Sequence, residues 1–179
     1  HIRKLKAQSG EYKFIQWSDF KYSDDLFIAT GHDITQKIIA ENEYQALIQN
    51  APDIIYDISK NGIITLINDA CLRILGYRKE EIIGTHFTNF LSPEEKENSL
   101  KYYVPENDEQ NDFEAYVLPV IAKSGKIVWF SQKVRIKRNL DNQLIGFSCV
   151  MRDITSTKKL EEQIIYKNNI LTHLSKYTN

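Results

Sequence analysis

Runs of β-forming, largely apolar residues in the last third of the chain, separated by short polar turns, predict three antiparallel strands. Ser124-Gly125 separates two β-rich runs, Phe113–Ala122 and Lys126–Ile136. Glycine tolerates the positive φ that a two-residue hairpin turn requires, so these two runs are expected to pair. A polar loop then leads to a third strand, which we expect over Leu144–Arg152.

The same pattern occurs once more near the start of the chain. Ala7-Gln8-Ser9-Gly10 corresponds to Ala122-Lys123-Ser124-Gly125, and both copies end in Asp-Ile-Thr, at residues 33–35 and 153–155. Self-similarity of this kind indicates two copies of one architecture in tandem. The first copy contains only the last third of the unit. Its expected strands are Ile2–Ala7, Tyr12–Ser18 and Leu26–Gly31.

Shorter elements are expected in front of the second copy. Two apolar strands are followed by short helices that end at glycines, and Ser92-Pro93-Glu94-Glu95 has the composition of a capped helix start. That helix should run to about Tyr103 and stop before Pro105. The expected strands are Asp53–Ile58 and Ile63–Asn68, and the expected helices are Asp69–Leu75 and Lys79–Ile83.

Two longer helices are expected outside this unit, over Thr35–Gln49 and Thr157–Lys176. In the second helix, steps of three, four and seven residues separate the apolar positions, as on one seam of a two-stranded coiled coil. A single helix packed on its own domain remains the alternative. The residues of the predicted dimer seam are Leu160, Ile164, Leu171 and Leu174.

Composition narrows the range of partners. The chain of 179 residues is 42% hydrophobic and 26% charged, with a net charge of −1, so its charge provides no general attraction to nucleic acid. No apolar run is long enough to span a membrane, and no signal peptide is present, so we expect a cytoplasmic segment without membrane contact. Cys71 and Cys149 lie in separate apolar segments and are expected to be buried thiols. Because the chain opens at His1 without a starting Met, we expect a fragment of a longer protein.

Together these motifs resemble the PAS domain family. The resemblance covers about residues 50–155 and depends on the order of its pieces rather than on any one of them. The pieces are Ala51-Pro52-Asp53-Ile54-Ile55-Tyr56, Asn61-Gly62-Ile63-Ile64-Thr65-Leu66-Ile67-Asn68, Leu75-Gly76-Tyr77, Glu80-Glu81-Ile82-Ile83-Gly84, Ser92-Pro93-Glu94-Glu95, Ser124-Gly125 and Asp153-Ile154-Thr155.

The resemblance implies an α+β fold, with a five-stranded antiparallel sheet, short helices over one face and flanking amphipathic helices. It implies that residues 1–34 are the last three strands of a preceding PAS unit, that 35–49 form a linker helix, that 50–155 form a complete PAS domain, and that 156–179 form a signalling helix. The junction of Asp153, Ile154 and Thr155 would end the last strand and start this output helix, with Asp and Thr oxygens capping its first N–H groups.

Catalytic and metal chemistry is not expected within this chain. The histidines His1, His32, His86 and His173 are scattered and have no ligand or relay spacing. The flavin photosensor branch of the family requires a cysteine just after Gly84, where Thr85–Phe90 has none. The haem branch requires a histidine on the helix after Ser92, where none occurs. We therefore expect neither flavin adduct nor haem, no metal, and no enzyme activity in this segment.

A small ligand between sheet and helices is an open alternative to a core filled by side chains. Both faces of the strands are apolar, so the sequence does not indicate which face points inward. The candidate pocket residues are Tyr56, Cys71, His86, Tyr102, Trp129, Ser131 and Ser148.

The predicted function is a PAS sensory or relay module of a bacterial signalling protein, with a histidine kinase favoured as the parent. It would form a homodimer through the C-terminal helix and the N-terminal strands. The alternatives are a ligand-free dimerisation scaffold, or the input domain of a cyclic-dinucleotide enzyme or a transcription regulator. Fold alone does not decide between them.

Overall fold

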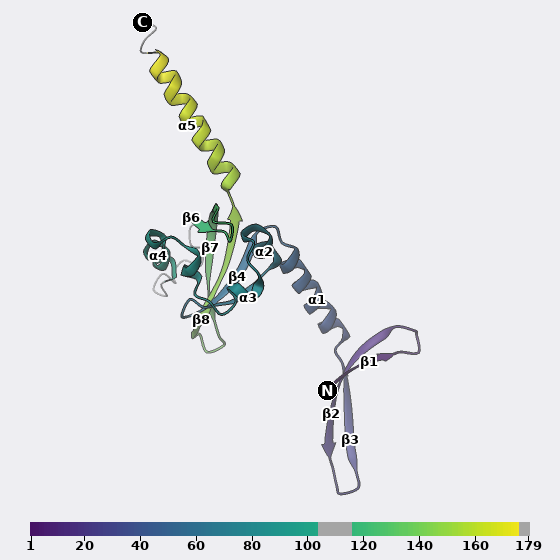
Figure 1. Ribbon diagram of the computed structural model, residues 1–179. Helices are drawn as coiled ribbons and strands as arrows, with labels where there is room; N and C mark the ends of the chain where they lie inside the picture. The colour runs from purple at the N-terminus through teal and green to yellow at the C-terminus, as the bar shows by residue number, and fades with distance from the viewer. Residues whose placement is uncertain (104–115, 176–179) are drawn as a thin grey trace. The chain divides into compact units, whose positions relative to one another are not determined.

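The computed structural model describes residues 1–103 and 116–175, and it separates into two compact units, His1–Ile48 and Gln49–Asn179. Strand β1 (Ile2–Lys6), strand β2 (Tyr12–Lys21) and strand β3 (Phe27–Asp33) form an antiparallel sheet in the first unit (Figure 1). Helix α1 (Thr35–Asn50) follows β3. The three strands predicted for this region are therefore present.

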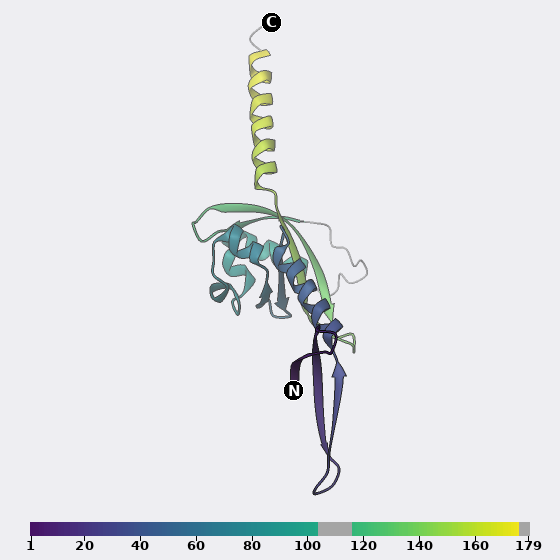
Figure 2. The same cartoon turned by 90° about the vertical axis from the view of Figure 1, so that its right-hand side faces the viewer.

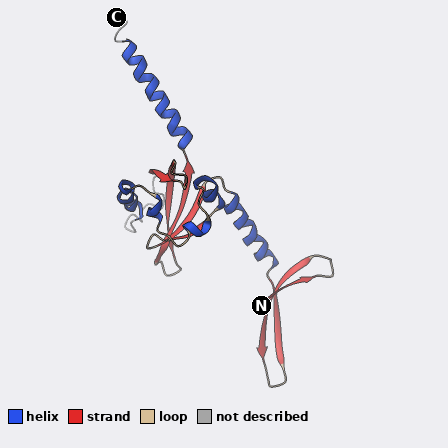
Figure 3. Cartoon of the chain, viewed as in Figure 1, coloured by secondary structure: helices blue, strands red, loops and turns tan. Residues whose placement is uncertain are grey.

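The second unit contains a five-stranded antiparallel sheet, whose strands are red in Figure 3. The strand order is β5-β4-β8-β7-β6. The last strand, β8, lies in the middle of the sheet, and the first strand of the unit, β4, pairs with it. The strands are β4 (Ile54–Ser59), β5 (Ile64–Ile67), β6 (Tyr116–Ile121), β7 (Ile127–Arg138) and β8 (Leu144–Asp153). The predicted strand Phe113–Ala122 begins with residues 113–115, which lie outside the described part of the chain.

Short helices cover one face of this sheet (Figure 2). Gly76 ends the first of them, with φ of 74°, and its N–H donates to the Leu72 carbonyl. Ser92 accepts a hydrogen bond from the Glu95 N–H at the start of α4. The helices are α2 (Asp69–Leu75), α3 (Lys79–Ile82), the 3-10 helix η1 (Phe87–Phe90), α4 (Pro93–Leu100) and the 3-10 helix η2 (Lys101–Tyr103).

The α4 helix differs in one respect from the prediction. Regular α-helix ends at Leu100, and the residues up to Tyr103 form a tighter 3-10 turn. This turn carries Tyr102 and Tyr103 towards the core, where Tyr102 stacks on Tyr116 with ring centroids 3.7 Å apart. Two aromatic side chains packed against the core account for the change in helix type.

The core lies between the sheet and the helices. Every second residue of β7 is buried, from Val128 to Val134, which is the period-two pattern of a strand with one covered face. Buried Asn68 fixes the helical layer to the sheet: its side-chain oxygen accepts from Ile55 N, and its amide donates to the Asp53 carbonyl. The sheet and helix α2 are therefore connected by the hydrogen bonds of a buried side chain as well as by apolar contact.

The two sheets have the same strand register. The cross-strand pairs Ile15↔Asp33 and Trp17↔Gly31 of the first sheet correspond to Phe130↔Asp153 and Gln132↔Met151 of the second. The Ser-Gly hairpins also match, since Gly10 N donates to Ala7 O and Gly125 N donates to Ala122 O, both at 2.9 Å. Strands β1 to β3 therefore reproduce β6 to β8 residue for residue.

Candidate sensory core and signal junction

A cavity of about 40 Å³ lies between the sheet and the short helices of the second unit. Strand residues form one wall, and the helical layer forms the other. The lining side chains are almost all aliphatic or aromatic. They are Ile54, Tyr56, Ile64, Ile67, Cys71, Leu75, Ile82, Phe87, Phe90, Leu91, Leu118, Val120, Gln132 and Met151.

A cluster of polar side chains is buried beside this cavity. The side-chain amide of Gln132 is fully buried; it donates to the Tyr103 hydroxyl at 2.6 Å and to the Tyr116 hydroxyl at 3.0 Å. Its oxygen accepts from the Tyr56 hydroxyl at 3.1 Å. The Tyr56 and Tyr103 hydroxyls lie 3.0 Å apart, and Cys149 Sγ lies 3.9 Å from the Tyr103 hydroxyl. Gln132 therefore connects three tyrosines from separate elements in the core.

Burial keeps this cluster uncharged. It raises the pKa of Tyr56 and of Tyr103 well above the usual range, and it raises the pKa of the Cys149 thiol to about 12. The pKa of the Cys71 thiol on the cavity wall is also raised to about 12 by burial. At neutral pH the cavity is consequently surrounded by neutral groups, and neither thiol is activated as a nucleophile.

The predicted pocket residues divide into three sets: two on the wall of the cavity, two near it, and three on the other face of the sheet. Tyr56 and Cys71 lie on the cavity wall. His86 and Tyr102 are half-buried beside it, since the His86 ring stacks on Phe87 and its Nδ1 lies 2.8 Å from the Thr88 hydroxyl. Whether any of them contacts a ligand stays a prediction.

Trp129, Ser131 and Ser148 lie on the opposite face of the sheet. Their neighbours in the strands, such as Phe130 and Cys149, are buried, and successive strand residues point to opposite faces. These three side chains therefore point away from the cavity. The sequence left the inward face undecided because apolar residues occur on both faces of these strands.

Gln132 is the main residue of the core that sequence reasoning missed. It occupies a buried position in a strand whose other inward residues are Val128, Phe130 and Val134. A polar residue on the apolar side of an alternating strand must find partners inside the protein, so this position signals a buried hydrogen-bond cluster. The partner Tyr103 belongs to the 3-10 turn, which the pattern did not identify.

The signal junction joins β8 directly to helix α5 (Thr155–Ser175). Asp153 Oδ1 accepts from the Thr155 N–H at 2.8 Å, and the Thr155 hydroxyl accepts from the Trp129 N–H at 3.0 Å. Ile154 N donates to the Trp129 carbonyl at 2.8 Å. The first residues of the helix are thus hydrogen-bonded to β7 as well as continuous with β8.

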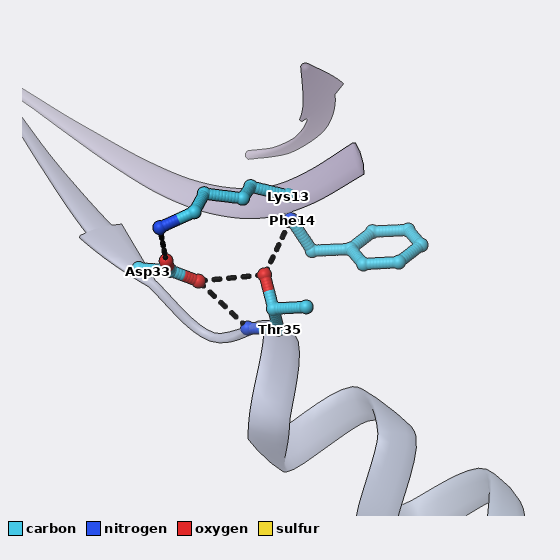
Figure 4. A network of polar contacts seen from close by, with 4 residues as sticks. All are labelled: Lys13, Phe14, Asp33 and Thr35. Carbon is cyan, nitrogen blue, oxygen red and sulfur yellow. Dashed lines mark hydrogen bonds and ion pairs between the residues drawn. The ribbon is translucent and has the colours of Figure 1, made fainter. Parts of the chain in front are cut away.

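The first copy of the junction repeats the two bonds donated by backbone N–H groups to the Asp and Thr side chains, and it adds a bond from the Thr35 hydroxyl to Asp33 (Figure 4). Asp33 Oδ1 accepts from Thr35 N at 3.0 Å and from the Thr35 hydroxyl at 2.6 Å, and that hydroxyl accepts from Phe14 N at 2.9 Å. Lys13 adds an ion pair to Asp33, 2.9 Å long. These contacts lower the pKa of Asp33 to about 2, and the hydrogen bond from the Thr35 hydroxyl contributes most to the shift.

Helix α5 exposes much of the predicted dimer seam. Leu160, Ile164 and Leu171 are 57%, 50% and 63% exposed. The side chain of Leu174 and residues 176–179 lie outside the described part of the chain. Within residues 1–103 and 116–175, no group of acidic, histidine or cysteine side chains is arranged to hold a metal. No described helix combines the length and hydropathy of a membrane span.

Comparison with known proteins places this geometry in a family. Residues 42–154 match the family described as the PAS fold. Sporulation kinase C of Bacillus subtilis is 25% identical over 134 residues, which are 74% of this chain and 31% of that protein. Sensor protein kinase WalK of Staphylococcus aureus is 25% identical over 118 residues, 66% of this chain and 26% of that protein. The chain therefore spans less than a third of the length of these relatives.

Solved structures share the fold at lower sequence identity. A PAS domain from Colwellia psychrerythraea has a TM-score of 0.60 and 20% identity, covering 65% of this chain and 98% of that one. A sensory box histidine kinase/response regulator from Burkholderia thailandensis has a TM-score of 0.56 and 17% identity, covering 73% and 98%. Since the family match also includes more than half of the residues, this chain belongs to the PAS domain family.

Proposed function

We propose that residues 50–155 are a sensory or relay module of a multidomain signal-transduction protein, a sensor histidine kinase, and that the output leaves through α5. The kinase relatives support this class of parent. The observation that carries the proposal is the junction at Asp153–Thr155, where strand and helix meet without an intervening loop. A rigid connection transmits a movement of the sheet, whereas a flexible linker would dissipate it.

The junction responds to the relative position of two strands. Thr155 is covalently continuous with β8, and its hydroxyl is hydrogen-bonded to Trp129 of β7. A displacement of β7 against β8 must therefore either break these bonds or reorient the start of α5. A signal biases such a two-state element by its differential affinity for the two states, and couplings of about 1–3 kcal/mol are typical.

The incoming chain reaches the same end of the sheet. Strand β4 begins where β8 ends, because Ile54 pairs with Met151. Asp53 precedes Ile54 and Arg152 follows Met151, and their side chains form an ion pair with a nitrogen–oxygen distance of 3.0 Å. A signal that arrives from residues in front of β4 thus meets the output junction directly, which supports a relay role in addition to any sensing in the core.

A parallel dimer through α5 is the second part of the proposal. Leu160, Ile164 and Leu171 follow one seam and are at least half exposed, and burying such a side chain contributes about 1.5–3 kcal/mol. We propose that this seam pairs with the same seam of a second copy. The segment is proposed to work in the cytoplasm.

The first unit is proposed to be the end of a preceding PAS unit. Its sheet has the register of β6 to β8, and within the described residues β3 pairs only with β2. In the second unit the corresponding edge of β8 pairs with β4. We propose that the free edge of β3 is covered in the dimer, because an unpaired edge strand is a template for another strand.

We also propose that the module works without flavin or haem. Thr85–Phe90 contains no cysteine to form a flavin adduct, and α4 contains no histidine to bind haem iron. The cavity of about 40 Å³ has room for about three water-sized groups, which is too little for either ring system. An absorbance spectrum of the purified protein tests this point, since a visible band from bound flavin or haem would contradict it.

The relay is tested in the full-length protein with the double variant Asp153→Ala/Thr155→Val. We expect autophosphorylation to persist and its response to signal to be lost, because the helix start is released from β7. The double variant Ser156→Ala/Thr157→Ala is the matched control, and it should respond normally. An unchanged response in the junction variant would reject the proposal.

The dimer is tested by cysteine crosslinking in a background where Cys71 and Cys149 are replaced by Ala and Val. Ile164→Cys should form a disulfide with a second copy readily, whereas Glu161→Cys, which lies off the predicted seam, should not. Equal crosslinking at both positions would contradict a parallel seam.

A further inference from the structure

We propose that the core cavity admits a small, uncharged, apolar molecule of about three heavy atoms and discriminates against polar and charged molecules. The inference rests on the proposed sensory role, and it names the chemical class of ligand for that same core. It follows from three properties of the cavity: its volume, the side chains of its wall and the hydrogen bonds that already involve their polar atoms.

The volume sets the size of the ligand. A water molecule requires about 10–15 Å³ of probe-occupied volume, so a cavity of about 40 Å³ has room for about three water-sized groups. An engineered apolar cavity of about 150 Å³ is known to stay dry and to bind benzene or xenon. The present cavity is smaller, so xenon or a three-carbon hydrocarbon fits the available space better than an aromatic ring.

The wall excludes charge. Among the described residues that line the cavity, none carries a charged side chain, and the Cys71 thiol is held neutral by burial. A carboxylate or ammonium in this space would lose its hydration without gaining a counter-charge, which is among the most costly transfers in proteins. A charged metabolite therefore has no partner here.

The hydrogen bonds disfavour an uncharged polar ligand as well. Tyr56 and Gln132 carry the hydrogen-bonding side chains of the described wall, together with the weak thiol donor. Both N–H groups of Gln132 are taken by Tyr103 and Tyr116, and the Tyr56 hydroxyl donates to the Gln132 oxygen. An alcohol that entered the cavity could donate to the second lone pair of the Gln132 oxygen, but its own oxygen would find no free N–H on the Gln132 amide unless one of these bonds broke.

Binding is measured by two-dimensional NMR of the 179-residue chain, with xenon under pressure, ethanol and acetate as three separate probes. We expect xenon to cause saturable shifts of the Ile54, Ile67 and Leu118 methyl groups. Acetate should leave these signals unchanged, and ethanol should saturate at least tenfold more weakly than a three-carbon hydrocarbon, propane. Equal or tighter binding of ethanol or acetate, or no saturable effect of xenon, would overturn the proposal.

Two variants fill the cavity without touching the hydrogen-bond cluster. Cys71→Leu adds volume on the wall and should abolish the xenon shifts. Val120→Ile adds one methylene and should weaken them, and it takes the place of Cys71→Leu if that larger change prevents folding. Ser131→Leu on the opposite face is the matched control and should retain full binding. Unchanged xenon shifts in both filling variants would place the xenon elsewhere and reject the assignment.

A third variant tests the polar argument separately. Tyr116→Phe removes one acceptor and leaves an N–H of Gln132 available to a ligand. Ethanol should then bind at least threefold more tightly than in the unmodified chain, while propane binding stays the same. No change in ethanol affinity would show that the occupied amide is not what excludes alcohols.

The outcome is independent of the relay test. Binding is read on this chain alone, whereas signal transfer is read in the full-length protein with junction variants. Loss of xenon binding with an intact relay would reject this inference only, and an unresponsive junction with intact xenon binding would reject the proposed function only.

Discussion

The two sheets share a register but differ in what lies beside and above them. In the second unit, the edge of β8 pairs with β4, and short helices bury one face of the sheet. In the first unit, the described part of the chain provides neither, and the side chains of Phe27 and Ile28 in β3 are 66% and 44% exposed. The comparison separates what three strands specify by themselves from what the front half of the unit adds.

Corresponding positions show this difference in side-chain size. Gln132 and Met151 face each other in the second sheet, whereas Trp17 and Gly31 occupy the same pair in the first. A Cβ on Gly31 would lie 2.8 Å from a methyl group of Ile15 and 3.3 Å from the Trp17 ring, so these two side chains cover the glycine. In the second sheet, the face that the helices cover carries the hydrogen-bonded amide of Gln132. In the first sheet, the corresponding face carries the indole of Trp17, packed on the backbone of Gly31. The polar core cluster is therefore a property of the completed unit.

The largest effect is expected where β8 meets β4. A side chain at Gly146 would place its Cβ 2.1 Å from the Ile58 carbonyl oxygen, so Gly146→Ala must separate the two strands. We expect the free energy of unfolding of the second unit to fall by about 3 kcal/mol. Urea unfolding followed by Trp129 fluorescence in a Trp17→Phe background measures it.

The matched position in the first sheet is Leu26, beside which the described residues provide no strand. Leu26→Ala, read by Trp17 fluorescence in a Trp129→Phe background, should change unfolding by about 0.5 kcal/mol or less. A loss comparable to that of Gly146→Ala would mean that the edge of β3 is as constrained as the edge of β8, and the comparison would fail.

The next effect is expected from the buried amide. Gln132→Leu removes the shared partner of Tyr56, Tyr103 and Tyr116, and it leaves hydroxyls unsatisfied in the core. We expect a loss of about 2 kcal/mol in the second unit, the usual cost of an orphaned buried polar group. Ser131→Ala, its neighbour on the opposite face, should cost about 0.5 kcal/mol or less. Equal losses in the two variants would remove the cluster from the account of core stability.

A smaller effect is expected at the output junction. Thr155→Val removes the acceptor of the Trp129 N–H and should cost about 1 kcal/mol locally. Amide hydrogen exchange of Trp129 should then accelerate about fivefold, since its protection depends on that hydroxyl. Thr157→Val, one half-turn into the helix, should leave the exchange rate unchanged. Equal acceleration in both variants would indicate a general loosening of the helix start.

The fold was predictable because local patterns were consistent with one another. The Ser-Gly hairpins, the glycines after the short helices and the Asp-Ile-Thr repeats each specify a local geometry, and together they specify the unit. Helix α4 was expected to reach Tyr103, but the last turn tightens because tyrosines packed against the core decide its geometry. Tertiary packing overrides local propensity at such a point.

The inner face of the sheet was less predictable. Trp129 and Phe130 are both aromatic, and the choice between them depends on which face the helices cover. Sequence alternation identifies two faces but does not indicate which one meets the helical layer, so Trp129, Ser131 and Ser148 were assigned to the pocket and lie on the other face. Gln132 could have been chosen instead, because it interrupts an otherwise apolar alternation.

The smallest effect concerns the charge at the first junction, where Lys13 stands in the position of Val128. Asp33 has a pKa lowered to about 2, first by the Thr35 hydroxyl, then by the Thr35 N–H, and only then by Lys13. The carboxylate therefore contributes to the stability of the first unit above about pH 4, and this contribution is lost as the pH falls towards 2. Carboxyl NMR titration of Asp33 should show a larger rise in pKa for Thr35→Val than for Lys13→Met. The Lys13 and Asp33 side chains are 46% and 42% exposed, so added salt should diminish only the Lys13 part. If Lys13→Met raised the pKa more than Thr35→Val, the ion pair rather than the Thr35 hydroxyl would dominate the charge of the first junction, and a contact with no counterpart at Val128 would set its pH dependence.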